Sequence, residues 1–63
     1  MWVIVWRGGG RDWYAAGWHP GEDGPRWDAR PDQAKRFVSY EQAETVRRQL
    51  SNPQWLRLER APE

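Results

Sequence analysis

Few side chains in this chain of 63 residues can do acid, base or nucleophilic chemistry. There is one histidine, no cysteine, two serines and one threonine. The one base that titrates near neutrality is therefore His19, which lies beside Pro20 with no serine paired to it in a known local signature. Glu22 and Asp23 are near His19, yet no spacing here matches a zinc or calcium site. We expect no enzymatic activity, no bound metal and no cofactor.

The glycine run Gly8–Gly10 is the second feature that could carry chemistry, because unhindered backbone amides can surround a phosphate. Nucleotide-binding fingerprints also need a helix directly after the glycines and a Lys-Ser/Thr pair or a spaced third glycine. Here Arg11, Asp12 and Trp13 follow and read as the start of a strand. We therefore interpret the run as a hairpin turn.

Tryptophan is the anomaly of the composition, with six residues in 63. Ten basic and nine acidic residues give a net charge of +1, so no global field attracts the chain to nucleic acid or to an anionic membrane. The absence of cysteine fits a reducing cytosol. The longest apolar run, Trp2–Trp6, is too short to span a membrane, and no signal-peptide pattern is present. These features predict a soluble cytoplasmic protein.

The pattern of apolar and turn residues predicts one α+β domain over residues 1–63. β-branched and aromatic residues predict four strands, and the capping box Ser39-x-x-Gln42 predicts the start of one helix. The expected elements are strands at 2–6, 12–18, 34–38 and 55–59 and a helix at 40–51. The order is β-β-β-α-β, a mostly antiparallel four-stranded sheet with one helix on one face.

A Pro/Gly-rich segment at 19–33 shows neither strand nor helix periodicity, so we predict a long loop. Loops of this length in compact domains are usually functional or disordered. Trp27 in its middle favours an ordered loop that faces a partner.

One helix covers only one face of a four-stranded sheet, so the other face must present side chains to solvent, to the loop or to a partner. We assume that the smaller side chains of the first strand, Val3 and Val5, lie under the helix. By alternation, the open face is then lined by some of Trp2, Trp6, Trp55 and either Trp13 or Trp18.

These features favour a monomeric, noncatalytic module that binds another protein. Tryptophan, tyrosine and arginine dominate the energetics of protein interfaces. The contact surface that we predict lies on and beside the loop and comprises Trp18, Glu22, Asp23, Arg26, Trp27, Asp28 and Arg30.

Two other classes stay open. A single-stranded nucleic-acid binder could stack bases on Trp and Tyr and contact phosphates through Lys35, Arg36 and Arg57. The aromatic signature of an RNA-recognition motif is missing, and the 19–33 loop is acidic. A structural protein of a virus-like particle is the third class.

The segment Ala34-Lys35-Arg36-Phe37-Val38-Ser39-Tyr40-Glu41-Gln42-Ala43 resembles small phage and prophage proteins in which a strand, a Ser/Thr cap and a Glu-x-Ala helix precede a last strand. The resemblance covers about the last half of the chain. Proteins of this kind include phage-encoded inhibitors of bacterial defence, notably anti-CRISPR proteins. The resemblance implies a partner that is a host nuclease or nucleoprotein complex, occluded by surface contacts in the host cytoplasm.

Overall fold

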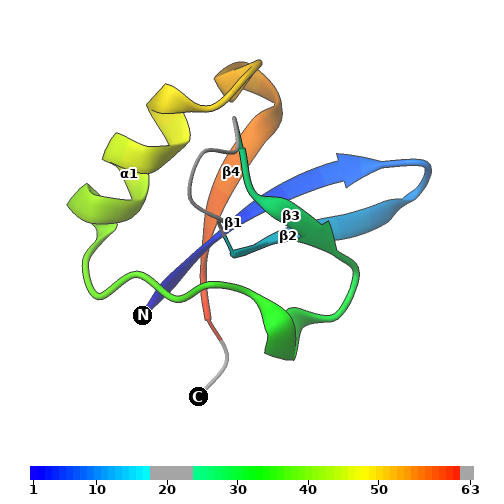
Figure 1. Ribbon diagram of the computed structural model, residues 1–63, viewed down its shortest axis with the longest axis horizontal. Coiled ribbons are helices and arrows are strands. Elements are labelled where there is room, and N and C mark those ends of the chain that lie inside the picture. The colour runs from blue at the N-terminus through cyan, green and yellow to red at the C-terminus, as the bar shows by residue number, and fades with distance from the viewer. Residues whose placement is uncertain (18–23, 62–63) are drawn as a thin grey trace.

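The computed structural model describes residues 1–17 and 24–61. Its strands form one antiparallel sheet in the order β3-β2-β1-β4, with one α-helix packed beside it (Figure 1). The predicted α+β class is therefore confirmed. The elements are β1 (Trp2–Gly8), β2 (Arg11–Gly17), β3 (Arg26–Asp28), the 3-10 turn η1 (Pro31–Gln33), α1 (Tyr40–Gln49), the 3-10 turn η2 (Pro53–Trp55) and β4 (Leu56–Arg60).

Strands β1 and β2 form the hairpin that the glycine run predicts. Gly8 pairs with Arg11, so Gly9 and Gly10 make the two-residue turn. Their φ angles are 63° and 80°, the left-handed values that glycine adopts without a steric penalty and that suit a tight hairpin. The turn sets a register in which Trp6 lies opposite Trp13.

The third strand is not where the sequence predicts it. The structure places β3 at Arg26–Asp28, inside the segment expected to be a loop, where it pairs with β2 across a register shift between Ala15 and Gly17. Three residues flanked by proline, glycine and charges are too few to show a period of two, which is why the pattern hides this edge strand.

The segment predicted as the third strand, 34–38, instead connects the ends of β1 and β2. The backbone N–H of Lys35 donates to the carbonyl of Ala15 at 2.8 Å, and Phe37 exchanges two backbone hydrogen bonds of 2.8 Å with Trp2. Only an isolated bridge forms here, between Trp2 and Phe37. Its aromatic residue, Phe37, is buried in the helix-side core, whereas its β-branched residue, Val38, is 73% exposed.

Helix α1 begins as predicted and ends two residues early. The Ser39 hydroxyl accepts a hydrogen bond from the Gln42 N–H at 3.2 Å, which is the predicted cap. The helix stops at Gln49, and Asn52 then takes a left-handed conformation with φ 53° before Pro53. Among the described residues, no helix has the length and apolar character needed to cross a membrane.

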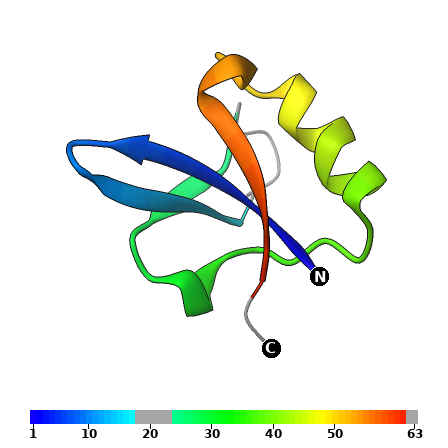
Figure 2. The same ribbon diagram turned by 180° about the vertical axis from the view of Figure 1, so that it is seen from behind.

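The assumption that Val3 and Val5 lie under the helix is wrong. The core on the helix side contains Ile4, Ala15, Phe37, Ala43, Leu50 and Leu56, with Trp2, Trp6 and Trp27 packed against it. Val3 and Val5 are buried on the opposite face with Ala34. Figure 2 shows α1 and the segment that carries η1 on opposite sides of the sheet. Because the helix presents the small side chain of Ala43 to the sheet, it leaves room for Ile4 and the large indoles.

Candidate functional site

A cleft lined by three indole rings opens on the helix side of the sheet, beyond the C-terminal end of α1. Its volume is about 310 Å³. The residues of this tryptophan cleft are Trp6, Trp27, Ser51, Asn52, Trp55 and Leu56. None of these side chains carries a charge, so the cleft is a largely apolar hollow to which Ser51 and Asn52 add a hydroxyl and an amide.

The sheet positions two of the indoles. Trp6 on β1 and Trp27 on β3 both project from the helix side, and their ring centroids are 6.2 Å apart at an interplanar angle of 60°. Ala15 on β2, the register partner of Trp27, is fully buried in the same cluster. A methyl group at position 15 leaves space for the two rings to meet over the strand between them.

Trp55 supplies the third wall from η2. The turn is set by the left-handed Asn52 and by Pro53, and the Trp55 N–H donates to the Asn52 carbonyl at 3.0 Å. The Arg47 guanidinium donates to the Pro53 carbonyl at 2.6 Å, which ties η2 to the helix. The Trp55 side chain nevertheless stays 62% exposed, whereas Trp2, Trp6, Trp13 and Trp27 are half-buried. Trp55 is contiguous with Trp6 and Trp27 around the cleft, and contiguous exposed apolar surface, rather than a single exposed side chain, is what marks an interaction site.

A smaller hollow of about 130 Å³ adjoins the tryptophan cleft. It is lined by Gly24, Pro25, Trp27, Leu50 and Ser51. Trp27 and Ser51 border both hollows. Trp27 and Ser51 therefore lie between two adjacent depressions.

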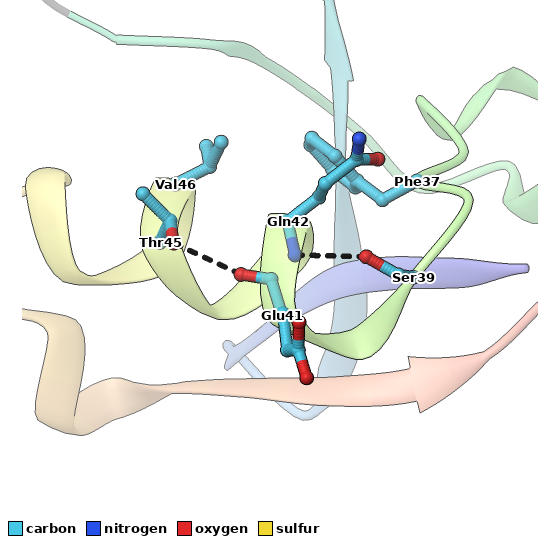
Figure 3. A pocket seen from close by; sticks show the side chains of 6 residues that line it. All are labelled: Phe37, Ser39, Glu41, Gln42, Thr45 and Val46. Carbon is cyan, nitrogen blue, oxygen red and sulfur yellow. Dashed lines mark hydrogen bonds between the residues drawn. The ribbon is translucent and has the colours of Figure 1, made fainter.

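A third hollow, of about 630 Å³, lies along the first turns of α1 (Figure 3). Its lining residues are Phe37, Ser39, Glu41, Gln42, Thr45 and Val46, and the Glu41 side chain leaves the helix in the direction opposite to that of Gln42 and Val46. Its hydroxyl groups are engaged by the helix backbone, because Ser39 accepts from the Gln42 N–H and Thr45 donates to the Glu41 carbonyl at 2.9 Å. This hollow therefore offers a ligand fewer free polar groups than its size suggests.

Of the contact residues predicted from the sequence, Trp27 is the one that the structure places in the tryptophan cleft. Asp28 and Arg30 instead bind each other: the Arg30 backbone N–H and guanidinium donate to the Asp28 carboxylate at 2.9–3.2 Å. These hydrogen bonds from the Arg30 side chain lower the pKa of Asp28 to about 2. Arg26 is exposed. Trp18, Glu22 and Asp23 lie outside the described residues.

Sequence reasoning assigned Trp6 and Trp55 to the wrong surface. It placed both on a face without the helix, whereas they share the cleft with Trp27. The alternation of β1 does put Trp6 on the same side as Ile4, so one further fact, that Ile4 lies under the helix, would have placed Trp6 on the helix side.

The opposite face carries charges rather than indoles. Arg57 lies 2.9 Å from Asp12 and 2.7 Å from Glu59, and Arg7 lies 3.7 Å from Asp12. The carboxylate of Asp12, followed by that of Glu59, raises the pKa of Arg57 above its ordinary value. These ion pairs lie on the face that also buries Val3, Val5 and Ala34, so the tryptophan cleft and the ion pairs are on different faces of the sheet.

Comparisons with protein-family models, with curated protein sequences and with solved structures gave no match to this chain.

Proposed function

We propose that this protein is a noncatalytic protein-binding module whose tryptophan cleft receives an apolar or aromatic side chain of a partner. The observation that carries the proposal is Trp55, held 62% exposed by η2 beside Trp6 and Trp27 around an uncharged hollow. Leaving so large an apolar group in water is unfavourable, and covering it with a partner removes that penalty.

The composition of the cleft suits a protein anchor. Tryptophan is among the residues that contribute most to binding when a partner covers them, and interface centres are depleted of charge. A volume of about 310 Å³ is at the low end for small-molecule sites and accommodates one or two side chains. Ser51 and Asn52 supply donors and acceptors at its border for the partner's backbone.

The nature of the partner stays a prediction that rests on the resemblance of residues 34–43 to phage-encoded inhibitors. On that basis the partner is a host nuclease or nucleoprotein defence complex, and the protein acts in the host cytoplasm by occluding it. The tryptophan cleft is then the element that grips the host protein.

The single-stranded nucleic-acid alternative receives less support from the same geometry. Among the residues that the structure describes, no cation lines the tryptophan cleft. Arg57, one of its expected phosphate contacts, is paired with two carboxylates, and the Lys35 ammonium lies over the Phe37 ring at 5.8 Å from its centroid. Stacking on Trp55 would therefore lack adjacent phosphate contacts.

The test compares the affinity of Trp55→Ala for a partner protein with that of a control variant, Tyr40→Ala. Tyr40 is a matched control because it is also an exposed aromatic residue, at 51%, but lies at the other end of α1. Once a host protein has been captured on the wild-type chain, its affinity for each purified variant is measured. We expect Trp55→Ala to weaken binding at least about tenfold and Tyr40→Ala to leave it nearly unchanged.

Equal affinity for the wild-type chain and Trp55→Ala would refute the cleft as the binding site. Tryptophan fluorescence titrated with an oligonucleotide separates the alternative class. Quenching that weakens steeply with salt would favour nucleic acid over protein as the ligand.

A further inference from the structure

Strand β4 is an edge of the sheet with a free ladder of backbone groups. In the order β3-β2-β1-β4 it pairs with β1 on one side only. The Ala61 N–H donates to the Met1 carbonyl at 2.8 Å, which sets the phase of the antiparallel ladder. Arg57 and Glu59 then direct their backbone groups toward β1, and those of Leu58 and Arg60 point outward.

The backbone of Leu56 also points away from β1. Only its carbonyl is free to pair, because its N–H already donates to the Pro53 carbonyl at the end of η2. In Figure 2, β4 lies at the front of the molecule and no segment is drawn in front of it. The described part of the chain therefore leaves this edge open to another strand.

The side chains of β4 are complementary to those of a second, antiparallel β4. Two edge strands can pair only through residues whose backbone N–H and carbonyl groups point away from β1. The pairing centred on β4 therefore places Leu58 opposite Leu58 of the second copy. Arg57 then lies opposite Glu59 of the second copy, and Glu59 lies opposite its Arg57. The side chains of Arg57 and Glu59 are 44% and 42% exposed, so both retain surface for this contact beyond their own ion pair.

The same charges disfavour the neighbouring registers. A shift that keeps the outward groups paired moves the strands by two residues. It places Arg57 opposite Arg57 of the second copy in one direction, and Glu59 opposite Glu59 in the other. Like charges directly opposite each other destabilise a strand pair. Charged residues commonly protect an edge strand against pairing with other chains. In β4 the opposite charges of Arg57 and Glu59 instead favour the register centred on Leu58.

We propose that two copies of this chain associate through β4, antiparallel and centred on Leu58, to form a sheet that is continuous across both copies. Backbone hydrogen bonds join Leu58 to Leu58, and the Arg60 N–H of each copy donates to the Leu56 carbonyl of the other. A contact limited to one short strand lies in the size range of weak interfaces. The protein should therefore be a monomer in dilute solution, as predicted from the sequence, and a dimer at high concentration.

The antiparallel pairing of two β4 strands also determines on which face of the joined sheet the two helices lie. Leu58 packs on the helix side, and paired residues of adjacent strands project to the same face. Both helices and both tryptophan clefts therefore lie on one face of the joined sheet. A partner that presents two anchors could engage both clefts with increased avidity, a consequence that rests on the proposed function.

Sedimentation velocity from about 10 μM to about 1 mM tests the association, since weak dimers dissociate in this range. We expect the sedimentation coefficient to rise from that of a monomer to that of a dimer. A single monomeric species at every concentration would overturn the proposal. The cleft variant Trp55→Ala should dimerise like the wild-type chain, so this test is independent of the proposed function.

A backbone modification tests the pairing through β4, and substitutions of Glu59 test its register. N-methylation of the Leu58 amide by chemical synthesis removes the outward N–H and should abolish the dimer, while the circular dichroism spectrum confirms the fold. Glu59→Arg places Arg57 opposite an arginine and should weaken the dimer at least about tenfold, whereas Glu59→Gln should weaken it less. A dimer that neither change weakens would rule out the β4 pairing.

A mixture of two chains with exchanged charges tests whether the interface can be restored. Chains with Arg57→Glu, made in an Asp12→Asn background to avoid repulsion within the chain, should not pair with themselves. Mixed with Glu59→Arg chains, they restore opposite charges at both cross-strand positions. We expect a heterodimer in the mixture and monomers in the separate samples. Monomers in the mixture, with both chains folded, would contradict the proposed register.

Discussion

The ring of Trp6 lies directly over Gly8 in β1. A Cβ added at Gly8 would come within 2.6 Å of the Trp6 Cη2 and Cζ2 atoms, closer than carbon atoms approach without displacement. The same glycine accepts a hydrogen bond at its carbonyl from the Trp13 indole N–H at 3.1 Å. Gly8 therefore fixes the positions of two indoles, one of which forms a wall of the tryptophan cleft.

Gly8→Ala should destabilise the protein by about 1 kcal/mol, because the new methyl group displaces the Trp6 ring from its packed position. Urea unfolding followed by tryptophan fluorescence measures the change. Gly17→Ala is the matched control on β2, since an added Cβ there meets nothing within 4 Å. A Gly8→Ala protein as stable as the control would mean that Trp6 can move freely.

Substitutions of Trp27 and Trp55 should have different effects on the free energy of unfolding. Trp27 is half-buried against the core, so Trp27→Ala should lower the free energy of unfolding by about 2 kcal/mol. Trp55 is mostly exposed, and Trp55→Ala should change it by less than about 0.5 kcal/mol. Chemical denaturation of both variants checks this contrast. A large loss of stability in Trp55→Ala would indicate a structural role for that ring.

Removing the helix cap should weaken the whole domain. Ser39→Ala deletes the acceptor of the Gln42 N–H and should lower the free energy of unfolding by about 1 kcal/mol. Ser39→Asp keeps an acceptor at the same position and should preserve most of the stability. Thermal unfolding monitored by circular dichroism compares the two. Equal losses in both variants would contradict capping as the cause.

Acid should destabilise the protein partly through Glu44. Hydrogen bonds from Arg47, and then from Arg48, lower the pKa of Glu44 from its ordinary value of 4.5 to about 2. A carboxyl group whose pKa is lowered by folding stabilises the native state above its unfolded pKa. That contribution is lost as the pH falls from about 4.5 through about 2.

The measurement is the difference in unfolding free energy between the wild-type chain and Glu44→Gln as a function of pH. We expect the difference to be largest near neutral pH and to shrink below pH 4.5, toward zero near pH 2. High salt should reduce it as well, because the pair is near the surface. A difference that stays constant with pH would exclude ionisation of Glu44 as its origin.

The sequence alone predicted those elements whose signals are local. Gly9 and Gly10 predicted the hairpin because a tight turn needs positive φ. Ser39 and Gln42 predicted the helix start because a cap is a contact over three residues. The alternation of Leu56 and Leu58 places both side chains on one face of β4, and the structure packs them at the helix-side core. The i, i+4 spacing of Glu44 and Arg48 favours a helical ion pair, which the structure shows at 3.1 Å.

Only the tertiary structure decided which face of the sheet the helix covers, where the third strand lies and which tryptophans meet. Alternation assigns Trp6 to a face of β1 but does not say what covers that face. The choice depends on how the small Ala43 fits over Ile4 and on how Ala34 closes the opposite side over Val3. These are packing relations between residues far apart in the chain, so no local pattern contains them. The tryptophan cleft and the open edge at β4 are both consequences of that choice.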